Sequence, residues 1–256
     1  MMGFRVLLKK ELREQLRTAR LVSVAVVFIF FGIFGVLTDR YMKEIIDAVG
    51  AQQGGFSVEL PPPSLKGDLG QVIKNISEFG IICALLLGMG AVAWEKERGT
   101  AGMIMTKPAS RAAFLAAKLG AISLNLLLAV VLGCGLAYVY TVLLYPDSFP
   151  MVGYVAMSAI LWWTLVEFTA ITLLASTVTR SAIAAAGIGF VAFLVLGILA
   201  AIPLIGPWVP VGLLGPASDL ALGNDAGNFA APLLLNLASV PALFGVAWLA
   251  FRRQEL

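Results

Sequence analysis

Residues 119–145 read LGAISLNLLLAVVLGCGLAYVYTVLLY, an apolar run of 27 residues without a charged side chain. A helix needs about 20 predominantly apolar residues to cross the hydrocarbon core of a bilayer. Charged side chains are costly in that core, so their absence over such a length is typical of a membrane-spanning helix. The run therefore predicts a membrane protein.

The composition of the whole chain supports this prediction. Of the 256 residues, 60% are hydrophobic and 13% are charged, and the mean hydropathy is +0.93. Soluble domains have about 45–50% apolar and about 25% charged residues. Apolar runs occur at 21–38, 76–94, 119–145, 152–178, 181–202 and 232–251. We expect an all-α membrane protein with six transmembrane helices in a single domain over residues 1–256, and both termini on one side.

The basic residues indicate which side that is. Four of the 18 Lys and Arg residues lie in one polar stretch, 39–75, and these are Arg40, Lys43, Lys66 and Lys74. All the others lie in segments that an even number of spans places on the opposite side. Cytoplasmic loops carry the excess of Lys and Arg, so we expect both termini and the loop 95–118 in the cytoplasm, and 39–75 as an external loop. The net charge of +3 is too small to predict a nucleic-acid partner, whereas its placement suits anionic membrane lipids.

Two segments outside the spans have patterns of their own. In residues 1–20, apolar side chains recur every fourth residue among basic ones, which predicts an interfacial helix at the cytoplasmic surface. In residues 203–231, four prolines prevent a complete span, and the segment has no Lys or Arg. We expect a broken re-entrant segment or short half-helices on the outer side, and a plain outer loop is the alternative.

The loop 95–118 is the most informative part of the chain for function. Gly99 is expected to end the second span's helix, and Ser110 to cap the third. Between them we expect a short helix, ended by Pro108, that exposes Met103, Ile104 and Met105. Such an apolar tip either binds a partner protein or folds onto the membrane surface. Residue pattern alone favours neither.

Signatures of an enzyme are absent from the sequence. It has no Walker A pattern, no G-x-S-x-G elbow, no H-E-x-x-H helix and no histidine at all. The two cysteines, Cys83 and Cys134, lie inside apolar runs and do not predict a metal site. We therefore expect a chain that binds no cofactor or metal and performs no catalysis itself.

The order of residues in the loop resembles that of ABC-2 type transporter permeases, the NosY-like branch in particular. The resemblance rests on the string E-x-x-R-G-T, followed by P-x-S-R and a later lysine, which here are Glu95, Arg98, Gly99, Thr100, Pro108, Ser110, Arg111 and Lys118. Residues 9–14, KKELRE, are similar to the N-terminal elbow helix of that family. Lys107 departs from the small or apolar residues that are more usual there.

This resemblance implies a permease subunit in the cell membrane of a prokaryote. It implies pairing with a second permease copy or a paralogue, and with two copies of an ABC ATPase subunit that bind ATP and Mg. The coupling helix would lie in 95–107, so that Glu97, Met103, Ile104 and Met105 would join the motif residues in docking on the ATPase. An exporter of an amphipathic or apolar cargo, working by alternating access, is the favoured function. An ion-coupled secondary transporter and a non-transporting scaffold or assembly factor are the alternatives.

Glu167 is the acidic residue that stands out within the predicted spans. A carboxylate at that depth costs several kcal/mol unless it is paired, protonated or hydrated, so it is a candidate for a translocation pathway. Asn125 and Asn236 are polar residues of neighbouring spans and belong to the same candidate set. The structural alternative is a protonated Glu167 hydrogen-bonded to one of these asparagines. Substitution of Glu167 by glutamine separates the two.

Overall fold

The computed structural model describes residues 2–52, 64–99, 110–144 and 150–254. In these ranges the chain is helical, without a strand. Six of the helices are long and apolar enough to cross a membrane. This confirms the predicted all-α membrane fold. The helices are α1 (Met2–Arg17), α2 (Arg20–Gln52), α3 (Leu65–Glu97), α5 (Arg111–Leu144), α6 (Met151–Val178), α7 (Ala182–Ala200), η1 (Gly206–Trp208), η2 (Pro210–Leu213), α8 (Leu214–Ala221) and α9 (Ala230–Arg252).

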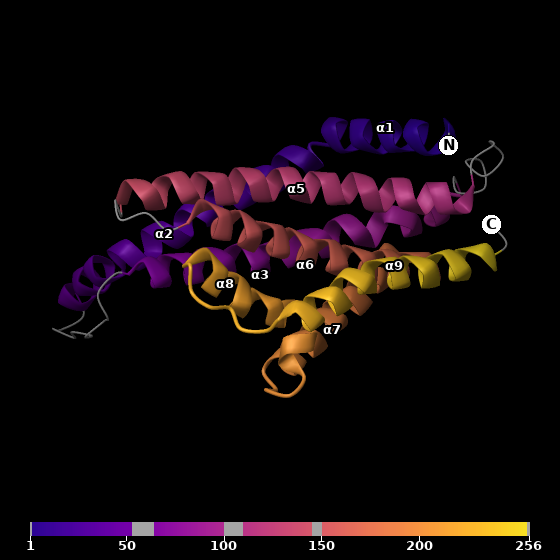
Figure 1. Cartoon of the computed structure of the whole chain (residues 1–256). Helices are drawn as coiled ribbons and strands as arrows, with labels where there is room; N and C mark the ends of the chain where they lie inside the picture. Colours follow the sequence, from indigo (N-terminus) through magenta and orange to yellow (C-terminus); the bar gives the residue numbers. More distant parts are fainter. Residues whose placement is uncertain (1, 53–63, 100–109, 145–149, 255–256) are drawn as a thin grey trace.

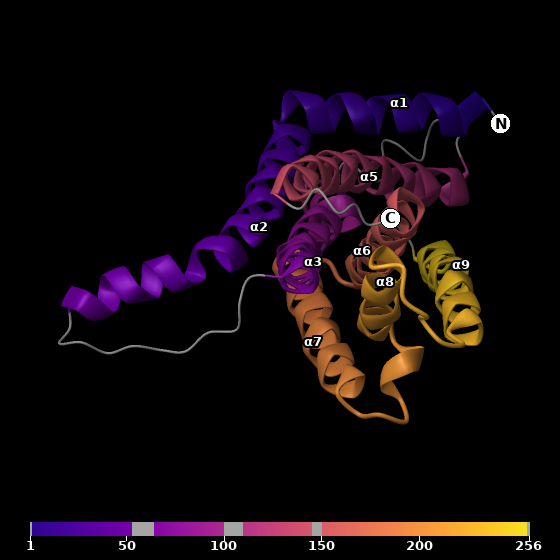
Figure 2. The same cartoon turned by 60° about the vertical axis from the view of Figure 1, so that its left-hand side comes forward.

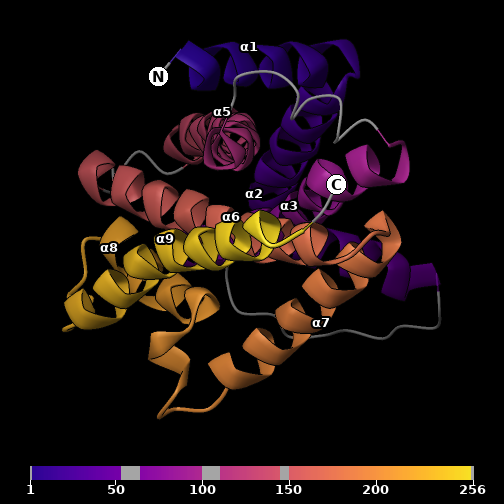
Figure 3. The ribbon, with the colours of Figure 1, turned by 90° about the vertical axis from the view of Figure 1, so that its right-hand side faces the viewer.

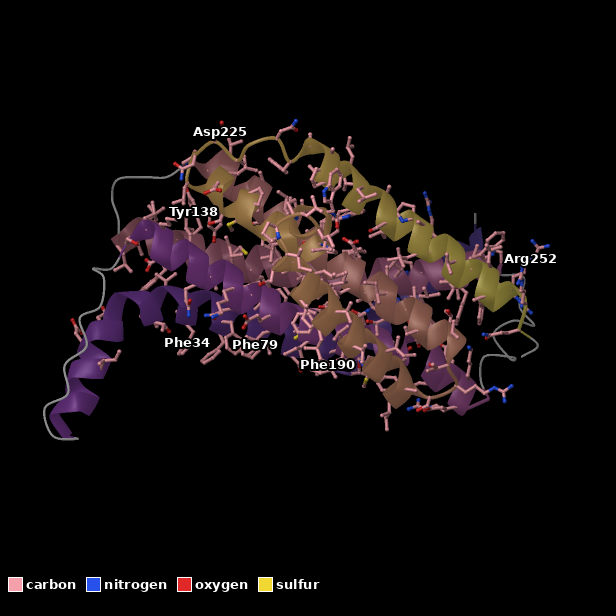
Figure 4. The ribbon with its side chains drawn as sticks, turned by 90° about the horizontal axis from the view of Figure 1, so that it is seen from below. Phe34, Phe79, Tyr138, Phe190, Asp225 and Arg252 are labelled. Carbon is pink, nitrogen blue, oxygen red and sulfur yellow. The ribbon has the colours of Figure 1, made fainter. Side chains whose placement is uncertain are left out.

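One end of the bundle collects the segments predicted to be cytoplasmic. The start of α1, the end of α9, the end of α3 and the start of α5 all lie there (Figure 1). Asp225 and Arg252, which precede and end α9, lie at opposite ends of the molecule (Figure 4). The arrangement is that of an even number of crossings, with both chain ends on one side.

Two helices extend beyond the apolar runs into the segment 39–75, and the external position of that segment stays a prediction. α2 continues beyond the first apolar run to Gln52, and Figure 2 shows this part leaving the bundle. α3 begins at Leu65, well before residue 76, and the Ser64 hydroxyl accepts a hydrogen bond of 3.1 Å from the amide of Gly67. The reason is that polar residues continue a helix as well as apolar ones do, so hydropathy alone misplaces a helix end that leaves the membrane.

Close approach of backbones joins α2 to α5. A Cβ placed on Gly32 would lie 2.6 Å from the carbonyl oxygen of Gly133, and one placed on Gly133 would lie 2.7 Å from the carbonyl oxygen of Phe28. No other residue type fits at either position without moving a helix. Small residues serve the same purpose at helix interfaces in membranes generally.

The outer faces of the bundle are apolar. In the most apolar stretch of each helix, the buried share is 17% for α7 and α9 and 61% for α3 and α6. The helices α3 and α6 therefore form the centre of the bundle. Phe34, Phe79 and Phe190, from α2, α3 and α7, lie along one edge of the molecule and are 44%, 36% and 49% exposed (Figure 4). Large apolar surfaces of this kind face lipid or another protein. The chain is a multi-pass membrane protein.

The proline-rich segment 203–231 is folded into short helices. Leu213, Leu214, Ala217 and Ala221 are buried in the main core, and α8 packs so closely on α6 that a Cβ on Gly153 would lie 1.9 Å from the Leu220 carbonyl oxygen. A plain outer loop does not bury its side chains in this way. The short helices agree with the predicted broken segment, and its depth in the membrane stays a prediction.

α1 occupies the residues predicted for the interfacial helix and lies across α5 (Figure 3). Its position at the membrane surface stays a prediction. The predicted coupling helix lies outside the described residues.

Candidate functional site

Both helices that border the loop end as the sequence predicts. α3 ends at Glu97, and Gly99 follows with a φ of 67°, a backbone conformation that glycine adopts without strain. The Ser110 hydroxyl accepts a hydrogen bond of 3.1 Å from the amide of Ala113 and so caps α5. Five candidate residues of the loop lie outside the described residues, and these are Thr100, Met103, Ile104, Met105 and Pro108.

Lys118 connects three helices through a buried ion network. Its ammonium lies 2.8 Å from Glu95 Oε1 of α3 and 3.3 Å from Glu11 Oε1 of α1, and its side chain is only 5% exposed. In a low-dielectric site, removing one partner of such a pair leaves an uncompensated charge and costs about 3–5 kcal/mol. The network therefore fixes α1 and the end of α3 to α5.

Lys10 completes this network at its exposed side. Its ammonium lies 3.1 Å from Glu11, 3.4 Å from Glu95 and 3.7 Å from Glu14. Burial alone would lower the pKa of Lys10, but the neighbouring carboxylates outweigh burial and raise that pKa above its ordinary value. Lys10 therefore stays positively charged. It pairs with Glu11 and Glu95 on the exposed side of the network, and Lys118 pairs with the same two carboxylates on the buried side.

Arg111 holds the end of α9. Its Nη1 donates hydrogen bonds of 2.7, 2.8 and 3.0 Å to the carbonyl oxygens of Phe251, Arg252 and Gln254. These carbonyls lie at the C-terminus of α9, where the regular amide partners of the helix run out and the negative end of the helix dipole lies. The start of α5 is thereby attached to the end of the last span.

Two residues at the end of α3 hold neighbouring helices in the same manner. The ammonium of Lys96 donates to the carbonyl oxygens of Thr177 and, at 3.3 Å, Thr179, where α6 ends. The carboxylate of Glu97 accepts a hydrogen bond of 2.9 Å from the amide of Ala182, where α7 begins. Each charge suits the helix end that it meets, a cation at a C-terminus and an anion at an N-terminus.

These contacts connect the flanks of the loop to α1, α6, α7 and α9. Of the predicted coupling residues, Glu95, Glu97, Arg111 and Lys118 all bond to other parts of this chain. The guanidinium of Arg98 is exposed and has no ion pair among the described residues. The sequence did not indicate the roles of Glu11, Lys10 and Lys96, although the resemblance of residues 9–14 to an elbow helix had marked that segment.

Glu167 lies between α6 and α9 and is 5% exposed. The Ser239 hydroxyl lies 2.5 Å from Glu167 Oε1 and 2.8 Å from the carbonyl oxygen of Asn236, while Oε2 has no hydrogen bond within the described part of the chain. A serine hydroxyl has one proton to donate. Ser239 shares this proton between Glu167 Oε1 and the carbonyl oxygen of Asn236, and so links the two residues.

Asn236 belongs to this cluster, and Asn125 does not. The carbonyl oxygen of Asn236 also accepts a hydrogen bond of 3.0 Å from Trp163, and its side-chain amide donates to the carbonyls of Pro232 and Trp208. Asn125 instead donates a hydrogen bond of 2.7 Å to Gln15 of α1. The structure therefore brings two of the three pathway candidates together and places the third at the interface of α1 and α5.

Comparison with known proteins assigns this arrangement to a class. Residues 5–219 match the family model of the ABC-2 family transporter protein, which covers the helices α1 to α3 and α5 to α7 and most of α8. The chain therefore belongs to the ABC-2 transporter family and is a membrane permease. It is also similar to an uncharacterized transmembrane protein, YxlG, of Bacillus subtilis (strain 168), with 27% identity over 252 residues that cover 97% of each chain.

Proposed function

We propose that this chain is the permease subunit of an ATP-driven transporter and that separate ABC ATPase subunits supply the energy through the loop between α3 and α5. The observation that carries the proposal is the bonding of the loop's flanks to α1, α6, α7 and α9. A force applied at the loop would therefore pass through these ion pairs and helix caps to the helices that they join. Permeases of this family work in general with an ABC ATPase, and ATP and Mg would bind to that partner.

The orientation follows from the distribution of basic residues. With the loop in the cytoplasm, an ATPase in the cytoplasm can reach it, and the membrane would be the cell membrane of a prokaryote. Two ATPase copies and a second permease, either this chain or a paralogue, complete the assembly that we propose, and we place the chain in the NosY-like branch of the family.

The cargo that we propose is amphipathic or apolar, and the direction is export by alternating access. The support is chemical, since the predicted spans contain few ionisable side chains. An ion-coupled transporter is the second candidate, because the buried carboxyl of Glu167 has a neighbouring hydroxyl to exchange protons with. The pairing of one carboxyl with one hydroxyl is a weak basis for ion coupling, so we retain the first proposal.

Co-purification tests the proposed docking. The matching ATPase is expected from an adjacent reading frame with a Walker A motif and an ABC signature. Replacement of Met103, Ile104 and Met105 by glutamate should abolish co-purification, whereas Arg253→Glu, at the same end of the bundle but outside the loop, should preserve it. Retained binding of the triple variant would refute the proposed docking site.

Cysteine labelling tests the orientation separately. Asp225→Cys and Arg253→Cys place a thiol in exposed positions near the two ends of α9. An impermeant maleimide added to intact cells should label only the variant at 225. Labelling at 253 would overturn both the cytoplasmic loop and the function built on it.

A further inference from the structure

A charged cavity of about 280 Å³ lies at the end of the bundle that carries the chain ends. Four helices enclose it, namely α1, the start of α2, the end of α3 and the first half of α5, and Figure 3 shows them meeting at this end. Its charged wall consists of Lys10, Glu11, Glu14, Arg20, Glu95, Arg98 and Lys118. The proposed coupling uses ion pairs in this wall, those of Lys118 with Glu11 and Glu95, but gives no role to the space that the wall encloses.

The charges of the wall do not cancel. The three carboxylates share the ammonium groups of Lys10 and Lys118 at distances of 2.8 to 3.7 Å. Arg20 and Arg98 also line the cavity, and neither guanidinium has an ion pair with a described residue. Four basic and three acidic groups give the wall a net charge of +1, and its positive groups outside ion pairs are the two guanidiniums, whose shape suits paired hydrogen bonds to a phosphate.

The remaining wall is mostly apolar, with Gln15 as its uncharged polar residue. Leu87, Gly90, Ala91 and Ile122 line it beside Trp94, whose ring lies 4.8 Å from the guanidinium carbon of Arg20. An apolar wall does not favour a free inorganic ion, because apolar side chains cannot replace the hydrogen bonds of its hydration water. A molecule with a phosphate at one end and a hydrocarbon part at the other matches both surfaces.

We propose that this cavity binds the headgroup of an anionic phospholipid from the cytoplasmic leaflet. Arg20 and Arg98 hold the phosphate, and the first part of an acyl chain lies against Leu87 and Ile122. Basic pockets between transmembrane helices on the cytoplasmic side are suited to such headgroups. The inference rests on the proposed orientation, but not on the proposed cargo or the ATPase.

The test is a binding titration of the full-length chain in a neutral detergent with phosphatidylglycerol, followed by native mass spectrometry. Each arginine near an anionic headgroup contributes about fivefold in affinity. Arg20→Gln and Arg98→Gln should each weaken binding by about that factor, and the double variant by about 25-fold if the effects add. The matched control is R180Q/R253Q, which removes the same charge at exposed positions outside the cavity and should change the affinity less than about twofold.

Three results would overturn the proposal. The first is equal weakening in the control, which would show attraction by net charge alone. The second is equally tight binding of phosphatidylcholine, which would remove the need for an anion. The third is displacement of the lipid by inorganic phosphate at a comparable concentration, which would identify free phosphate as the ligand.

The single variant R20Q separates this site from the proposed function. Arg20 lies outside the loop, so R20Q should lose lipid affinity while it still co-purifies with the ATPase. If R20Q keeps its full lipid affinity, the cavity site is refuted whatever the ATPase does. The unfolding temperature of each variant without lipid shows that the chain is folded when its affinity is measured.

Discussion

Replacing Lys118 with methionine should destabilise the chain far more than the same replacement at Lys10. Both ammonium groups pair with Glu11 and Glu95, and both variants remove one positive charge. The difference is burial, because the side chain of Lys118 is 5% exposed and that of Lys10 is 45% exposed. The comparison therefore isolates the effect of burying an ion pair.

The magnitude follows from the two environments. Removal of one partner of a buried pair costs about 3–5 kcal/mol, and removal of an exposed partner costs about 0.2–1 kcal/mol. For a chain of this size, each kcal/mol shifts the unfolding temperature by about 2–4 °C. Lys118→Met should lower that temperature by about 6–20 °C, and Lys10→Met by no more than about 4 °C.

The assay is thermal unfolding of the purified chain in detergent, followed by the loss of helical circular dichroism. A triple variant, K118M with E11Q and E95Q, should recover most of the lost stability, because no unpaired charge then remains in the site. Equal shifts for Lys118→Met and Lys10→Met would refute the reasoning. So would a triple variant that is no more stable than Lys118→Met alone.

Three further predictions concern other contacts. Glu167→Gln should change the unfolding free energy by less than about 1 kcal/mol, because the side-chain carbonyl oxygen of glutamine accepts a hydrogen bond from Ser239 as Glu167 Oε1 does, and a loss above about 2 kcal/mol in chemical unfolding would contradict this. Gly133→Val should lower the free energy of unfolding by about 1–3 kcal/mol, since its Cβ would meet the backbone of Phe28. Gly135→Val is the control: a Cβ there meets nothing within 4 Å, so the loss should be at most about 1 kcal/mol. Equal losses would exclude the close approach of α2 and α5. Arg111→Gln should speed amide exchange in the last turn of α9 at least about tenfold, and unchanged exchange there would mean that Arg111 does not hold that end.

The sequence predicts the membrane-spanning part of this fold well for a physical reason. An unsatisfied or charged group is so costly in hydrocarbon that apolar runs mark the spans, as at residues 119–145. That signal ends where the membrane ends, so it could not place the end of α2 at Gln52 or the start of α3 at Leu65. A helix that continues into water has no such constraint on its composition.

The candidate site shows a similar division. Gly99, Ser110 and Glu167 could be found because their residue type acts locally, as a helix stop, a cap or a buried acid. The pairs of Lys118 with Glu11 and of Asn125 with Gln15 join residues 107 and 110 positions apart, and no local pattern records them. The sequence did not indicate Ser239, because serine is common in membrane helices and its presence there predicts no particular partner.

The attachment of α1 to α5 has a consequence for biogenesis. Chains emerge from the ribosome N-terminal end first, so Glu11 and Gln15 are made long before their partners Lys118 and Asn125, which lie on α5. Until that helix has entered the membrane, α1 lacks its buried partners and has weaker contacts such as the exposed pair of Lys10 with Glu95. The docking of α1 onto α5 is thus a late step in the maturation of the protein. It can take place only after half of the bundle has been assembled.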